Sequence, residues 1–75
     1  NGEPRQNGRT DMFIQDIAYV INELSQGMTL KAGTIIATGT PAGVGMGFTP
    51  PRFLKKGDKV TCEIDKIGQL TNYIV

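Results

Sequence analysis

A glycine-rich loop that follows an apolar run is the feature that most constrains this chain. The stretch TIIATGTPAGVGMG, residues 34–47, opens with Ile35–Ala37, which predicts a short buried strand. The loop after it has glycine at positions 39, 43, 45 and 47 and proline at position 41. Glycine has no Cβ, so main chain built from it can approach other groups closely. We therefore expect this loop to lie against another segment or against a ligand.

One helix is expected before the loop. Apolar residues recur at helical spacing between positions 14 and 24, which predicts a helix over residues 12–26 with one apolar face. Thr10 or Asp11 is placed to cap its start, and Gly27 to end it in the left-handed conformation. The acids Asp11 and Asp16 favour the start of the helix by their charge.

A hairpin is expected at the C-terminal end. Val60, Cys62 and Ile64 alternate with polar residues, as in a strand with one buried face, and a second strand follows a turn at residues 66–68. Pro50–Pro51 excludes a regular helix or strand just before it. Two Asn-Gly pairs in residues 1–10 predict tight turns around a short extended stretch. The fold class is therefore mixed β with one helix.

Composition excludes several classes of function. The 75 residues carry a formal net charge of +1, and their basic residues are scattered, so nothing favours a nucleic-acid partner. No apolar run approaches the length of about 20 residues that spans a membrane. One cysteine allows no internal disulfide, and a cytoplasmic location is expected. The ten glycines indicate a loop-rich piece of a larger protein.

Familiar catalytic and nucleotide-binding motifs are absent. No lysine follows the glycines as a P-loop requires, and Phe48 occupies the third glycine position of a dinucleotide-binding motif. The chain has no histidine to serve as the base of a nucleophilic triad. Cys62 is thus expected to be an inert core thiol. Glu63 and Asp65 lie two residues apart, so their carboxylates could bind one divalent ion together. The neighbouring lysines instead favour a solvent-exposed face for this part of the strand.

The loop itself carries one positive signal. Thr38 and Thr40 flank Gly39 directly after the expected strand. Backbone N–H groups joined by a hydroxyl at such a place form a cradle for a carboxylate or enolate oxygen. The alternative is a tight structural loop whose glycines only satisfy the backbone geometry. The residues alone leave both interpretations open.

Six short motifs occur in order along the chain: N-G-E…R-Q, T-D-M-F, SQGMTL, T-G-T-P-A-G-V-G, F-L-K-x-G-D and I-G-x-L-x-N. In this combination they resemble the C-terminal part of the fumarylacetoacetate hydrolase superfamily, and its hydroxyheptadienedioate isomerase and acylpyruvase-like branch in particular. The resemblance covers nearly all of residues 1–75, which would form the C-terminal fragment of the catalytic domain, part of its β-roll.

This resemblance implies a divalent-metal-dependent enzyme that acts on 2-oxo or 1,3-dicarbonyl acids by C–C bond hydrolysis, decarboxylation or enol–keto isomerisation. Thr40 matches the family's threonine that contacts the substrate carboxylate, and Gly39 supplies the neighbouring backbone. The ligands for Mg²⁺ or Mn²⁺, and the catalytic groups, are expected upstream of these residues. A homodimer is also implied. A non-catalytic module that binds small acids and a purely structural segment are the alternatives.

Overall fold

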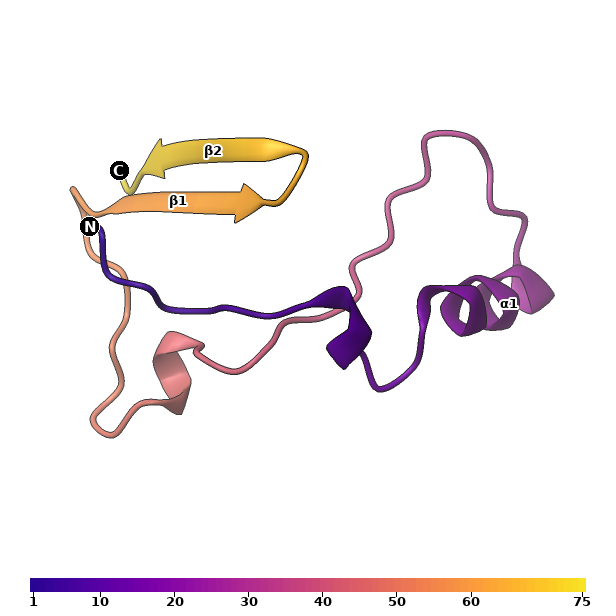
Figure 1. The fold of residues 1–75 in the computed structure, drawn as a ribbon, viewed down its shortest axis with the longest axis horizontal. Helices are drawn as coiled ribbons and strands as arrows, with labels where there is room; N and C mark the ends of the chain where they lie inside the picture. Colours follow the sequence, from indigo (N-terminus) through magenta and orange to yellow (C-terminus); the bar gives the residue numbers. More distant parts are fainter.

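One α-helix, two single 3₁₀ turns and one β-hairpin make up the regular structure. The computed structural model describes residues 1–75, with overall extents of 42 × 26 × 23 Å. In chain order the elements are η1 (Thr10–Met12), α1 (Ile17–Gly27), η2 (Gly45–Gly47), β1 (Lys59–Ile64) and β2 (Gly68–Tyr73). Figure 1 shows α1 at one end of the molecule and the hairpin toward the other, where both termini lie. None of the helices combines the length and the apolar character that a membrane span requires.

Helix α1 is shorter than the sequence predicts, and its caps differ. The side chain of Asp16 accepts a hydrogen bond of 2.7 Å from the backbone N–H of Tyr19, which makes Asp16 the N-cap. The predicted caps, Thr10 and Asp11, belong instead to the separate turn η1. Gly27 is the last helical residue and does not have a positive φ, so the prediction of a left-handed end was wrong.

The predicted hairpin is confirmed. Strands β1 and β2 pair antiparallel in a register that runs from Lys59 opposite Tyr73 to Ile64 opposite Gly68. Lys66 supports the turn with a φ of +65°. The register places an apolar face on one side of the ribbon and a polar face on the other. The apolar face carries Val60, Cys62, Ile64 and Leu70, with Asn72 as the one polar side chain, opposite Val60.

No layer packs on these apolar faces, and no residue of the chain is fully buried. The strand predicted at Ile35–Ala37 is absent, and the side chain of Ile35 is 94% exposed. Cys62, which was predicted to lie in a core, is also exposed. Both predictions were wrong for one reason: the only two elements in contact are β1 and β2, so no other strand or helix covers these side chains. The sheet that these residues form has two strands, and the β-roll stays a prediction.

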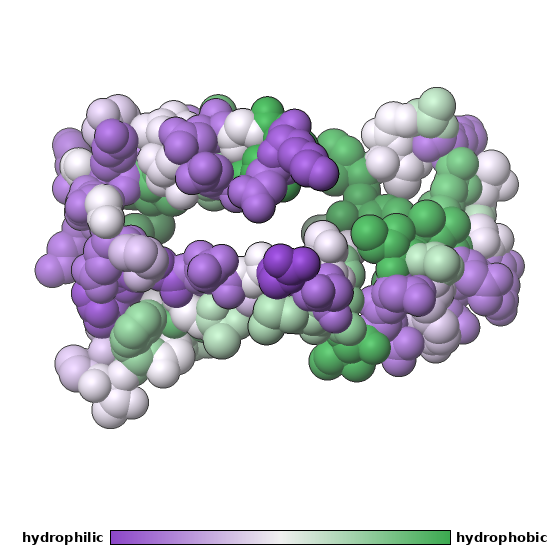
Figure 2. Space-filling model, viewed as in Figure 1, coloured by the Kyte–Doolittle hydropathy of each residue, from purple (hydrophilic) through white to green (hydrophobic).

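The N-terminal segment, residues 1–9, forms an irregular extended chain and not the predicted tight turns. It is anchored beside β1, where the backbone nitrogen of Asn1 donates to the carbonyl oxygen of Lys59 at 2.7 Å and the N–H of Lys59 donates to the Asn1 side chain at 2.9 Å. From there it runs toward the middle of the molecule (Figure 1). Figure 2 shows open space between this segment and the hairpin along most of their length.

Candidate functional site

The loop of residues 38–47 has an open side at Gly39. This residue has a φ of +93°, a backbone conformation that side-chain-bearing residues rarely adopt. Apart from its two chain neighbours, no residue has an atom within 4 Å of the position that a Cβ at Gly39 would occupy. Thr38 and Thr40, on either side, are exposed. Main chain and two hydroxyl groups are therefore accessible together at the point that the sequence indicates as a cradle.

The other side of the loop lies against the N-terminal segment. The side-chain nitrogen of Gln6 donates to the hydroxyl oxygen of Thr40 at 2.6 Å and to the carbonyl oxygen of Pro41 at 2.8 Å. A Cβ added to Gly8 would lie 3.2 Å from the Cβ of Pro41, so these two residues are already in close contact. The glycine-rich loop thus approaches another segment of the same chain.

Two of the loop glycines are needed for this close packing. A Cβ at Gly43 would overlap the carbonyl oxygen of Arg5, and one at Gly45 would overlap that of Arg52. Gly45 also accepts a 2.8 Å hydrogen bond from the N–H of Arg52. Gly43 and Gly45 therefore have a structural role, whereas Gly39 faces open space.

A charged cluster joins the N-terminal segment to the chain that follows the loop. The guanidinium groups of Arg5 and Arg52 lie 5.5 and 5.0 Å from the centre of the Phe48 ring. One nitrogen of Arg52 donates to both carboxylate oxygens of Glu3, at 3.0 and 3.1 Å. Attraction of a cation to an aromatic face is worth about 0.5–1 kcal/mol at exposed sites. The cluster therefore stabilises the contact between the two segments modestly, in addition to the hydrogen bonds of Gln6.

The residues of this chain do not fit a metal centre. No group of three or more His, Cys, Asp or Glu side chains is placed to hold an ion. Glu63 lies on β1 and Asp65 in the turn after it, and both are exposed. A ligand set for Mg²⁺ or Mn²⁺ would have to come from outside these 75 residues.

One titratable group is clearly perturbed, and its environment explains why. The pKa of Asp58 is lowered, first by the hydrogen bond from the Asn1 side chain at 2.9 Å and then by the N–H of Lys55 at 2.8 Å. Both donors favour the ionised carboxylate. Asp58 therefore has a structural role, because its hydrogen bond from Asn1 holds the N-terminal segment beside the start of β1.

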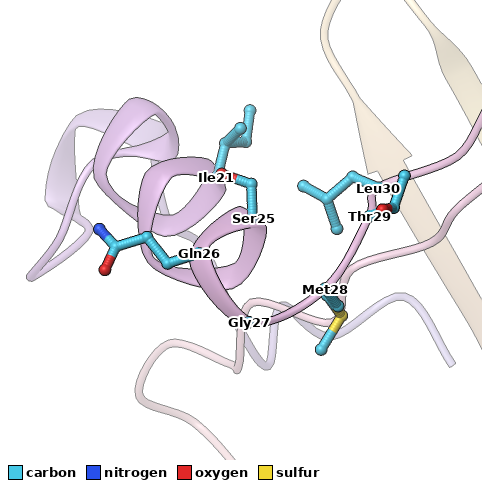
Figure 3. Close-up of a pocket in the computed structure, with 7 residues that line it drawn as sticks. All are labelled: Ile21, Ser25, Gln26, Gly27, Met28, Thr29 and Leu30. Carbon is cyan, nitrogen blue, oxygen red and sulfur yellow. The ribbon is translucent and has the colours of Figure 1, made fainter.

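A shallow hollow at the end of α1 is a second concave surface. Figure 3 shows Ile21 and Ser25 of the helix facing Leu30 across it. Its lining contains no charged side chain and consists of Ile21, Ser25, Gln26, Gly27, Met28, Thr29 and Leu30. Without an ionisable or charged group this surface offers nothing for acid–base chemistry or for recognition of an acid.

Sequence reasoning singled out Gly39 and Thr40 but missed Gln6, the residue that contacts Thr40. The two residues are 34 positions apart, and neither periodicity nor a local motif relates them. Correlated substitutions among related proteins are the kind of signal that reveals such a pair.

Comparisons with known proteins agree with the motif analysis. All of residues 1–75 match the family model described as "Fumarylacetoacetate (FAA) hydrolase C-terminal". The oxaloacetate tautomerase YisK of Bacillus subtilis is 60% identical over 74 residues, which is 99% of this chain and 25% of that protein. An uncharacterized protein of Staphylococcus aureus strain USA300 is 54% identical over the same share of each chain. The chain thus spans about a quarter of the length of the curated relatives it matches. It belongs to the fumarylacetoacetate hydrolase family and corresponds to the family's C-terminal region.

Proposed function

We propose that this chain forms one wall of the active site of an enzyme that interconverts the enol and keto forms of a 2-oxo acid, within a larger catalytic domain. The observation that carries the proposal is the 60% identity to a protein named as an oxaloacetate tautomerase, across 99% of the chain. It favours isomerisation over the C–C hydrolysis and decarboxylation that the family resemblance also implies.

The exposed loop provides the chemistry that this wall would supply. Enol–keto interconversion passes negative charge onto the oxygen atoms of the substrate, beside a carboxylate that is already charged. The hydroxyl of Thr40 and the main chain at Gly39 offer donors on the open side of the loop. Donors that are fixed in place before reaction stabilise such charge without reorganising.

The loop of residues 38–47 has no ionisable side chain that could transfer the proton itself. The chain as a whole has no histidine, and its one cysteine lies on the hairpin. The base and the ligands of a divalent metal belong to the rest of the proposed enzyme, for which Mg²⁺ or Mn²⁺ is the metal that the resemblance implies. A homodimer in the cytoplasm is part of the same proposal, and light scattering of the full-length protein tests the assembly.

The test is a tautomerase assay on the full-length protein. Loss of the enol absorbance of oxaloacetate is followed with and without enzyme, and Thr40→Val is compared with wild type. A hydrogen bond to a charged group contributes about 1.5–3 kcal/mol, so Thr40→Val should lower kcat/KM by about 10- to 100-fold. Thr40→Ser keeps the hydroxyl and should retain most of the activity.

Three outcomes would contradict parts of this proposal. Release of CO₂ or of a cleaved product, with no isomerisation, would replace the reaction. Binding of 2-oxo acids without turnover would make the protein a binding module. An unchanged kcat/KM in Thr40→Val would show that Thr40 does not contact the substrate.

A further inference from the structure

The amide of Gln6 has only one orientation that satisfies its neighbours. Its terminal group lies 2.8 Å from the carbonyl oxygen of Pro41, which can accept a hydrogen bond but cannot donate one. The atom beside Pro41 must therefore be the amide nitrogen and not the amide oxygen. That same nitrogen lies 2.6 Å from the hydroxyl oxygen of Thr40. Both hydrogens of the amide are thus used, one for each oxygen.

This orientation determines what the Thr40 hydroxyl can do. Because Thr40 accepts a hydrogen bond from Gln6, its own hydrogen must point to a different partner. The structure gives this hydroxyl no other hydrogen bond, and the residue is exposed. The hydroxyl hydrogen is therefore free to donate to a group outside the chain, and the neighbouring Gly39 has no side chain that would obstruct such a group. A donor that itself accepts a hydrogen bond is also polarised by it and strengthened.

We propose that Gln6 is a positioning residue that fixes Thr40 as a hydrogen-bond donor toward the bound acid, which selects a carboxylate over a group that must itself donate. The inference rests on the proposed function, because it assigns the orientation of a hydroxyl in that site. The close contact between Gly8 and Pro41, and that between Gly43 and Arg5, hold the two segments in place for it.

The first experiment is a double-mutant cycle in the full-length protein. Gln6→Met keeps the length of the side chain and removes both donors. A net hydrogen bond contributes about 0.5–1.5 kcal/mol, so this variant should lower kcat/KM for oxaloacetate by about 2- to 10-fold. In a Thr40→Val background the same change should have a much smaller effect on kcat/KM, because no hydroxyl is left to orient and only the hydrogen bond to Pro41 is lost. Gln15→Met, at an exposed position without hydrogen bonds, is the matched control.

The second experiment reverses the hydrogen bond. In Gln6→Glu the new carboxylate accepts from Thr40 at neutral pH, which turns the hydroxyl hydrogen inward. Activity should fall at least as far as in Thr40→Val and should recover, relative to wild type at the same pH, as the pH is lowered and the carboxyl group gains a proton. Gln15→Glu, which makes the same charge change elsewhere, should show no such recovery. A purely structural role of Gln6 predicts lower stability with no change in the pH profile.

The results separate this inference from the proposed function. If wild type turns over oxaloacetate and Gln6→Met lowers kcat/KM equally with and without the Thr40→Val substitution, the role of Gln6 is overturned and the proposed function stands. If wild type has no turnover, the affinity for oxalate, measured by calorimetry with Mn²⁺ present, replaces kcat/KM in the same cycle. Absence of both turnover and oxalate binding overturns the function and the inference together.

Discussion

Replacing Gly43 by alanine tests the central contact of this structure, the packing of the glycine-rich loop on the N-terminal segment. Gly43 has a φ of +110°, and a Cβ there would overlap the carbonyl oxygen of Arg5. Gly57 provides a matched comparison, since its φ is +91° but no atom lies within 4 Å of its Cβ position. Both substitutions strain the backbone, and only Gly43→Ala also pushes two segments apart.

The magnitude follows from the contacts that would be lost. Placing alanine in a left-handed conformation costs about 1–2 kcal/mol at either position. Moving the loop away from Arg5 also breaks the hydrogen bonds from Gln6 to Thr40 and to Pro41. At about 0.5–1.5 kcal/mol each, these two bonds add roughly 1–3 kcal/mol to the destabilisation by Gly43→Ala.

Urea denaturation of the full-length protein measures the difference in unfolding free energy between the two variants. The kcat/KM of the folded protein should also fall in Gly43→Ala and stay near wild type in Gly57→Ala, because only the first displaces Thr40. Equal destabilisation by the two substitutions would refute the close packing of the loop.

Four further outcomes are expected. Arg52→Ala should lower the unfolding free energy of the full-length protein by about 1 kcal/mol in urea titrations, since an exposed ion pair and an exposed cation–π contact are each weak. The lowered pKa of Asp58 means that its stabilising effect is present above the unfolded value of 3.8 and is lost as pH falls through the folded value, so Asp58→Asn should flatten stability against pH in that acid range. Titration of the isolated chain with Mn²⁺ should give no micromolar site, and one abolished by Glu63→Gln would contradict the assignment of Glu63 to solvent. A thiol reagent should label Cys62 readily in the isolated chain, where it is exposed, and slowly in the full-length protein, where we expect another layer to cover the hairpin.

Local sequence patterns predicted the helix and the hairpin of this chain better than they predicted which residues are buried or paired. The alternation around Cys62 gave the strand and its turn correctly because cross-strand pairing depends on neighbouring residues. Helical spacing predicted α1, but not its start, since both Asp11 and Asp16 are good caps and only the folded chain shows which one is used. The run at Ile35 has strand composition but no pairing partner here, so composition alone misled.

The candidate site shows the same division. Gly39 and Thr40 were predicted from a local motif; in the structure both are exposed, and the space at Gly39 is open. The contact from Gln6 depends on two segments that are 34 residues apart, which no local pattern encodes. The orientation of the Thr40 hydroxyl is a property of that contact, so it becomes visible only when the segments are placed together.

The exposed apolar faces explain how the loop would be held in a larger protein. Ordering a backbone costs about 1–2 kcal/mol per residue, and burial of apolar surface is the main term that offsets this cost. Here no residue is fully buried, and Ile17, Ile21 and Leu70 remain 53%, 45% and 66% exposed. Figure 2 shows hydrophobic residues gathered beside α1 with nothing over them.

Contacts within these 75 residues therefore fix the local shape of the loop but cannot fix its position relative to a substrate. That position requires layers packed on the apolar faces of α1 and of the hairpin. Relatives four times as long have the residues to provide such layers. Thr40 is then placed by two separate sets of interactions. Gln6 and the close approach at Gly43 hold its loop to the N-terminal segment, and apolar packing on either side would position that unit against the rest of the proposed enzyme. A substitution in either set should alter the position of Thr40. Changes at Gln6 should turn its hydroxyl group, and changes in the apolar packing should move the whole loop.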